Sequence, residues 1–105
     1  MTTFSRVAVL CGALALPALA ATPEAWTEHK KAVLAACMKA SGLEQPRPAG
    51  KLIEYPDRLG LTAILLRGRY PQPHMEGRMG QELCLYDRRS RTAFVSEADS
   101  ILLKP

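Results

Sequence analysis

LTAILLRGRY, residues 61–70, is the strongest β-strand pattern in this chain of 105 residues. Side chains alternate between the two faces of a strand, and here both alternating sets are largely apolar. The even set is Thr62, Ile64 and Leu66, and the odd set is Leu61, Ala63 and Leu65. A sheet built on this strand therefore needs a cover on each face.

Weaker strand patterns accompany this one. Residues 81–87, QELCLYD, and residues 92–96, TAFVS, are separated by the polar turn RRSR and predict a hairpin. Residues 51–55 predict a short strand, which a turn at residues 56–60 ends. Residues 44–50, EQPRPAG, predict an extended connector rather than more helix, because they contain two prolines and a glycine.

A single amphipathic helix is predicted over residues 22–42. Thr22 is a suitable N-cap, Pro23 fits the first helical position, and Gly42 ends the helix. At helical spacing one side comprises Trp26, Lys30, Val33, Leu34, Cys37 and Ala40. We expect Trp26 to anchor this mainly apolar side in the core.

The first twenty residues have the pattern of a secretory signal. Residues 7–16, VAVLCGALAL, are apolar and uncharged, and Pro17 and the small-x-small triplet ALA at residues 18–20 follow them. Cys11 lies inside this run. We expect cleavage after residue 20, so that residues 21–105 form one small domain, exported to the periplasm or the medium and without a membrane span.

Cleavage would leave two cysteines, Cys37 and Cys84, in an oxidising compartment. Neither belongs to a Cys-x-x-Cys motif or has a histidine beside it in sequence, so a structural disulfide is expected rather than a reactive or metal-bound thiol. The bond would tie the helix to the strand at residues 81–87. Cys84 and Tyr86 would then face the helix, and Leu83 and Leu85 would face away from it.

These elements predict an α+β fold in which the N-terminal helix packs on a three- to four-stranded antiparallel sheet, with one helix-to-strand disulfide. What covers the second sheet face stays open at this stage. The candidates are the apolar tail at residues 101–103, a second copy of the chain in a homodimer, and a foreign partner.

The segment between the two longest strands, residues 70–80 (YPQPHMEGRMG), is too long for a tight hairpin turn. Its prolines favour a stiff polyproline conformation in the first half, and Gly77 and Gly80 favour chain reversals in the second. We interpret it as a protein-binding loop, with a plain connector as the alternative. The expected contact residues, including arginines at the neighbouring strand ends, are Tyr70, Pro71, Pro73, His74, Met75, Arg67, Arg69 and Arg78.

Two ligand classes compete with a protein partner. His74, Met75 and Met79 supply the imidazole and thioether donors that suit Cu(I). Residues 58–91 hold seven arginines against three acids, and Arg67 and Arg69 share a strand face. Together with Arg78 or the turn at residues 88–91, they predict a patch for phosphate, sulfate or an acidic surface.

No catalytic constellation is evident. His29 lies beside the apolar side of the helix and is expected to be a boundary residue, and His74 lacks a paired serine or cysteine nucleophile. The sequence has no phosphate-binding glycine motif, dinucleotide fingerprint or zinc spacing. Export and the lack of interleaved aromatics argue against nucleic acid. The expected function is that of a small exported, non-catalytic module without a cofactor, which binds a protein partner; the alternative is a periplasmic protein that binds soft metal or anions.

Overall fold

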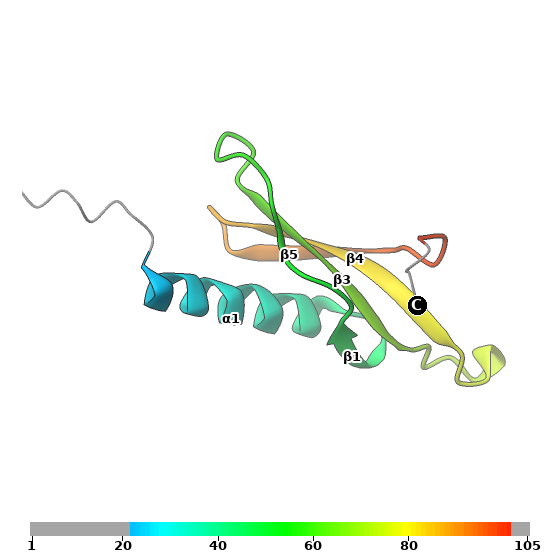
Figure 1. Ribbon diagram of the computed structural model, residues 1–105. Coiled ribbons are helices and arrows are strands. Elements are labelled where there is room, and N and C mark those ends of the chain that lie inside the picture. Colours follow the sequence, from blue (N-terminus) through cyan, green and yellow to red (C-terminus); the bar gives the residue numbers. More distant parts are fainter. Residues whose placement is uncertain (1–21, 102–105) are drawn as a thin grey trace, which may run out of the picture.

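The computed structural model describes residues 22–101, which form one helix and a five-stranded antiparallel sheet (Figure 1). The elements are α1 (Pro23–Ala40), β1 (Glu44–Pro48), β2 (Ile53–Glu54), β3 (Leu61–Arg69), β4 (Met79–Asp87) and β5 (Thr92–Glu97), with a 3₁₀ turn at Pro73–Met75. The predicted α+β class is confirmed. The signal segment and its cleavage site lie outside the described residues, as do residues 102–105. No helix within residues 22–101 is long and apolar enough to span a membrane.

The sheet follows the order β1-β3-β4-β5, and β2 also pairs with β3. Strands β3 and β4 pair along their whole lengths, from Leu61 opposite Asp87 to Arg69 opposite Met79. The predicted hairpin between β4 and β5 is confirmed. The sheet holds more strands than predicted, because the connector at residues 44–50 contributes β1. Its prolines are compatible with a strand at the sheet edge, where fewer backbone N–H groups need partners.

Helix α1 begins as predicted, because the Thr22 hydroxyl accepts a hydrogen bond from the Ala25 amide at 3.0 Å. It ends at Ala40, two residues before Gly42, and the extended Ser41 forms the C-cap. The Glu82 carboxylate of β4 then accepts hydrogen bonds from the Ser41 hydroxyl at 2.6 Å and the Gly42 amide at 3.0 Å. A side chain remote in sequence therefore fixes the end of the helix, so glycine is not needed as a cap.

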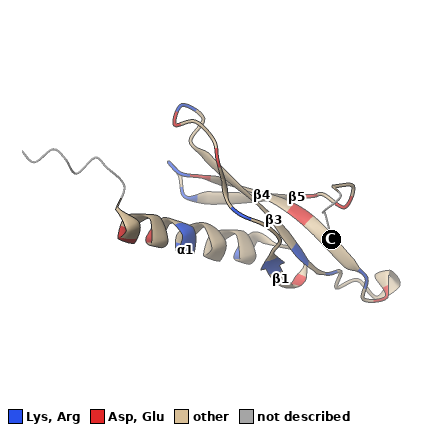
Figure 2. Cartoon of the chain, viewed as in Figure 1, with Lys and Arg blue, Asp and Glu red and all other residues tan. Residues whose placement is uncertain are grey.

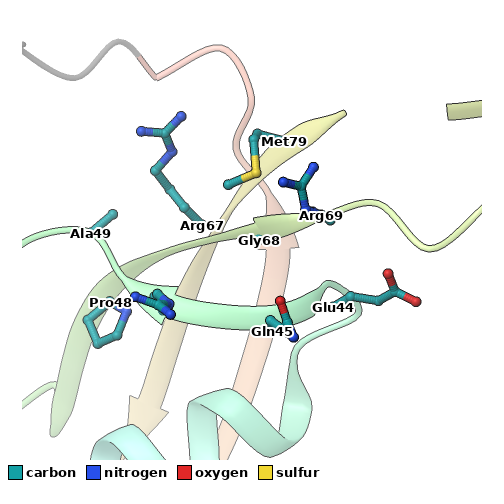
Figure 3. A pocket seen from close by; sticks show the side chains of 9 residues that line it. Glu44, Gln45, Pro48, Ala49, Arg67, Gly68, Arg69 and Met79 are labelled. Atoms are coloured by element: carbon teal, nitrogen blue, oxygen red, sulfur yellow. The ribbon is translucent and has the colours of Figure 1, made fainter. Parts of the chain in front are cut away.

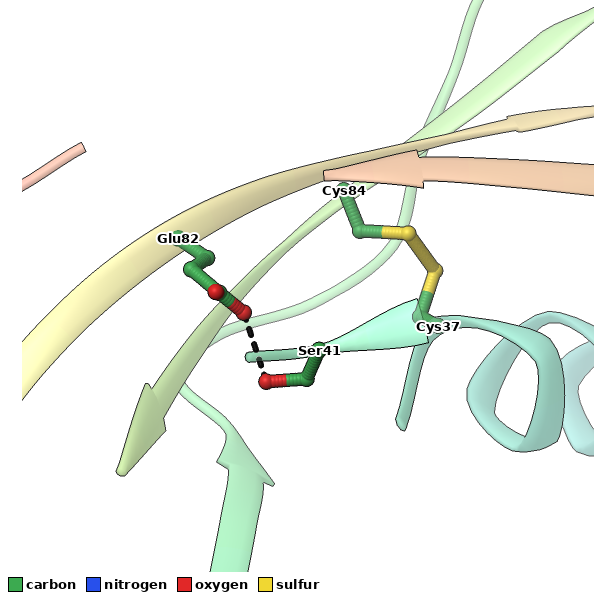
Figure 4. The surroundings of a disulfide bond; sticks show 4 residues. All are labelled: Cys37, Ser41, Glu82 and Cys84. Atoms are coloured by element: carbon green, nitrogen blue, oxygen red, sulfur yellow. Dashed lines mark hydrogen bonds between the residues drawn. A yellow bond between two sulfur atoms is a disulfide. The ribbon is translucent and has the colours of Figure 1, made fainter. Parts of the chain in front are cut away.

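The Cys37–Cys84 disulfide joins α1 to β4, as predicted (Figure 4). Both cysteines are fully buried, and they share a core with Val33, Ile64 and Leu66. Tyr86 is also buried on this side. The face of the sheet that carries these residues is called the inner face below.

Trp26 is not in the core, and the prediction that it anchors the helix is wrong. Its side chain is 46% exposed, whereas the fully buried helix residues are Val33 and Cys37. The disulfide lies in the C-terminal half of α1, so the close packing is concentrated there. Apolar periodicity shows which side of a helix faces the sheet but not how far along the helix contact continues.

Candidate functional site

The outer face of the sheet, opposite α1, is only partly covered. Leu65 pairs with Leu83 and Leu85 pairs with Phe94 on this face, and the leucines are half-buried. Phe94 is 59% exposed, and Ile53, which pairs with Ala63 on the same face, is 57% exposed. The predicted inward and outward directions of Cys84 and Leu83 are thus confirmed, and an apolar stripe remains accessible to a partner.

Arginine side chains gather at one end of this outer face. A groove with a volume of about 540 Å³ is lined by Glu44, Gln45, Arg47, Pro48, Ala49, Arg67, Gly68, Arg69 and Met79 (Figure 3). Arg67, Arg69 and Met79 extend from the same side of the sheet (Figure 3). We call the part of this hollow formed by Arg47, Arg67, Arg69 and Met79 the arginine groove. Figure 2 shows basic residues on β1 and on the neighbouring end of β3.

A bulge in β1 turns Arg47 toward this groove. Glu44 pairs with Arg69 and Arg47 pairs with Arg67, so three steps along β1 oppose two along β3. In a regular ladder Pro46 would stand opposite Arg67. The extra residue is accommodated at Gln45, whose φ of 48° is in the left-handed region that non-glycine residues seldom adopt. Bulges of this kind often re-aim a side chain beside a functional site.

Gly68 makes room for the bulge. A Cβ atom at this position would lie 2.7 Å from the Glu44 carbonyl oxygen and 2.8 Å from the Leu43 Cβ. Any side chain on residue 68 would therefore push β1 away from β3. The bulge and the glycine together place Arg47 beside Arg67. Two like charges directly opposite each other on paired strands destabilise the fold.

The arginines of the groove form no ion pair with the described residues, although the Glu44 side chain also lines the hollow. Within residues 22–101, no carboxylate lies within ion-pair distance of Arg47, Arg67 or Arg69. Arg69 donates one hydrogen bond to the Gly77 carbonyl at 2.8 Å. The guanidinium groups of Arg47 and Arg67 form no hydrogen bond within residues 22–101. The groove thus presents unused donors to a carboxylate or a phosphate.

The loop at residues 70–80 is held largely by its own contacts. Pro73 begins the 3₁₀ turn, so the predicted polyproline conformation does not continue past Gln72. Gly77 has a positive φ of 69°, as a chain reversal requires, but Gly80 lies within β4 and reverses nothing. A Cβ on Gly80 would instead lie 2.6 Å from the Tyr70 ring, so this glycine provides the space in which Tyr70 packs.

The predicted contact residues therefore separate into two groups. Tyr70 and Arg78 stabilise the loop: Tyr70 donates to Asp99, and the Arg78 guanidinium lies 3.6 Å from the Met75 sulfur. Arg78 is nevertheless exposed, and the other predicted contact residues also face solvent in whole or in part: Pro71, Pro73, His74, Met75, Arg67 and Arg69. Of these, Arg67 and Arg69 lie in the arginine groove.

Positive charges lie near both sulfur ligands of the soft-metal hypothesis. The Arg78 guanidinium donates to the Met75 sulfur at 3.6 Å. Met79 stands opposite Arg69 in the sheet, so it too is close to a positive charge. Copper binding by His74, Met75 and Met79 stays an untested prediction.

Arg67 and Arg69 do not meet the turn at residues 88–91, so that part of the anion prediction is wrong. The antiparallel register places this turn beyond Leu61, at the opposite end of β3. Arg88 donates to Glu54 at 3.0 Å and to the carbonyls of Leu61 at 2.5 Å and Tyr55 at 3.1 Å. It is a structural residue. The partner of Arg67 is Arg47, which sequence reasoning placed in a connector.

A polar cluster of Arg88, Glu54, Thr62 and His29 links the turn to α1. Thr62 is fully buried and donates to Glu54 at 2.7 Å, and the His29 Nε2 lies 3.1 Å from the same carboxylate. These groups satisfy one another. The Thr62 hydroxyl is buried, whereas His29, Glu54 and Arg88 also line a surface hollow beside Trp26.

No protein-family model, curated protein or solved structure matches this chain. The site is therefore interpreted from its own geometry and charge.

Titration of Tyr70 tests how the loop is anchored. Its hydrogen bond to Asp99 raises the pKa of Tyr70 from 10.0 to about 12, and the same bond, with one from the Gln81 amide, lowers the pKa of Asp99. We expect one phenol to ionise near pH 12 in an ultraviolet titration. Asp99→Asn should bring this step down toward pH 10.

These two pKa shifts make the stability of the fold depend on pH in a definite direction. A raised tyrosine pKa stabilises the fold fully below pH 10 and ceases to do so as the pH rises through about 12. The lowered pKa of Asp99 stabilises the fold above its ordinary value of 3.8, and this contribution is lost as the pH falls through the lowered value. Asp87→Asn is the control, because amides of Arg89 and Ser90 lower the pKa of Asp87 far from Tyr70. An unchanged phenol titration in Asp99→Asn would contradict the anchor.

Proposed function

We propose that this protein is a small, exported, non-catalytic module that binds an acidic protein surface through the outer face of its sheet. The arginine groove would receive carboxylates, and the adjoining stripe with Phe94 would receive apolar side chains. The exposed edge of the loop at residues 70–80 borders the groove and would extend the contact. The observation that carries the proposal is the juxtaposition of Arg47 and Arg67, which the Gln45 bulge maintains without a neutralising carboxylate.

A protein partner is favoured over a small anion because the groove continues into apolar surface. Met79 is 49% exposed beside the arginines, and Phe94 is exposed farther along the same face. Interfaces combine arginine with aromatic and methionine side chains in this way. A second copy of the chain is less suitable, since a symmetric contact centred on the groove would bring arginines against arginines.

Binding to acidic polypeptides tests the proposal directly. We expect a glutamate-tyrosine copolymer to bind more tightly than poly-L-glutamate, and inorganic phosphate to bind more weakly than either, as measured by calorimetry at two salt concentrations. Arg47→Gln with Arg67→Gln should weaken copolymer binding at least about tenfold, because two desolvated charge contacts are lost. Phe94→Ser should remove the preference for the copolymer over poly-L-glutamate.

The matched control is Arg58→Gln with Arg91→Gln, which removes the same charge from two exposed arginines outside the groove. If this pair weakens binding as much as the groove pair does, binding follows net charge alone and the proposed site is wrong. If phosphate competes fully and Phe94→Ser has no effect, the groove is a simple anion site and the protein-binding proposal fails.

A further inference from the structure

A second hollow lies on the other side of the molecule, between α1 and the segment that joins β1 to β2. Its volume is about 470 Å³, within the range of about 300–1,000 Å³ that small-molecule pockets occupy. The helix contributes Trp26, Lys30 and Leu34, and the joining segment contributes Lys51 and Leu52. Ile64 of β3 also lines it.

The bottom of this pocket is the protein core. Ile64 is only 1% exposed and belongs to the cluster around the disulfide, and Leu34 and Leu52 pack against that cluster while remaining partly accessible. Trp26 is half-exposed and lines the pocket. The centroid of its ring lies 5.5 Å from that of the His29 ring. An apolar chain entering here would contact the leucine and indole surface that water now reaches, above the buried Ile64.

The charged groups that line the pocket are all positive. Lys30 stands one helical turn from both Trp26 and Leu34, so its stem lies on the same stripe of α1. Lys51 contributes a second ammonium from the joining segment. Within the described residues neither lysine has an ion pair or a side-chain hydrogen bond. The pocket thus combines an apolar floor with two unpaired cations and no carboxylate in its lining.

We propose that this pocket binds a single-chain carboxylate with an apolar tail, of the fatty-acid class. The tail would lie on Ile64, Leu34 and Leu52, and the carboxylate would accept hydrogen bonds from Lys30 and Lys51. The half-exposed indole of Trp26 would close over the tail. This site is on the α1 side of the sheet and is independent of the arginine groove.

The chain has one tryptophan, so its fluorescence reports on the pocket. We expect dodecanoate, titrated below its micelle concentration, to produce a saturable blue shift in emission as Trp26 loses water. Dodecyltrimethylammonium, with the same tail and the opposite charge, should bind at least about tenfold more weakly, because it meets the two lysines as a like charge. Backbone amide shifts should concentrate at residues 30–34, 51–52 and 64.

Lys30→Gln with Lys51→Gln should weaken dodecanoate binding at least about tenfold and abolish the preference for the anion. The control is Lys31→Gln with Lys39→Gln, which removes equal charge from helix positions outside the pocket and should change neither. Circular dichroism should show both pairs folded. Equal binding of the anion and the cation, or equal losses in the two lysine pairs, would overturn the proposal.

Two other occupants give distinguishable results. A blue shift on raising the protein concentration without ligand would show that a second copy fills the pocket. A response to vesicles of anionic phospholipid but not to monomeric dodecanoate would show membrane docking. Either result would overturn the fatty-carboxylate assignment.

Discussion

Replacing Cys37 and Cys84 together by alanine should lower the free energy of unfolding by about 4 kcal/mol. The two residues are 47 positions apart, and loop closure on this scale restricts the unfolded chain by about that amount. Net stabilities of small domains are only about 5–15 kcal/mol. The melting temperature should therefore fall by about 15–30 °C, measured by circular dichroism.

Reduction of the native protein without alkylation provides the comparison. Both cysteines are fully buried, so the alanine pair also loses core packing, whereas brief reduction without alkylation keeps the sulfur atoms in place. We expect the reduced protein to lose most of the same stability. An unchanged melting temperature, or two freely alkylated thiols in the native protein, would contradict the role assigned to the bond.

Arg88→Ala should destabilise the protein by about 3 kcal/mol, the second largest effect expected. Its side chain is 22% exposed, and the guanidinium holds the Glu54 carboxylate and the carbonyls of Leu61 and Tyr55. Truncation removes these charge-assisted hydrogen bonds and leaves Glu54 with Thr62 and the Leu61 carbonyl with the Tyr55 amide. Arg88→Lys should recover less than half of the loss, since one ammonium cannot match the planar fork of donors.

Arg91→Ala is the control for this turn. Arg91 is exposed, and its side chain forms no hydrogen bond within residues 22–101, so urea unfolding should shift by less than about 0.5 kcal/mol. If Arg88→Ala changed the free energy of unfolding as little as Arg91→Ala, the hydrogen bonds of Arg88 would not stabilise the fold.

The main elements of the fold were predictable because their signals are local. The Thr22-Pro23 start of the helix, the strand at residues 61–70 and the hairpin after it depend on capping, alternation and turn chemistry. The pairing of Cys37 with Cys84 followed from cysteine count. That pairing in turn oriented Cys84 inward and Leu83 outward, as the sheet register confirms.

The candidate site was only half predictable. Arg67 and Arg69 were identified from their shared strand face, but Arg47 was missed because the prolines and glycine of residues 44–50 predicted a connector there. The signal that would have found it is the glycine at residue 68, which permits another backbone to approach closely. Tyr70 was taken as a contact residue, although its hydroxyl is engaged by Asp99 across a separation of 29 residues.

Sequence by itself determined the α+β class, the helix-to-strand disulfide and the direction of alternate side chains on β3 and β4. Each follows from the spacing of apolar residues along a short segment or from the number of cysteines. Tertiary structure alone decided that Trp26 stays at the surface, that Arg47 joins Arg67, and that Arg88 is structural. These outcomes depend on the register between distant strands and on where α1 leaves the sheet, and long-range packing fixes both.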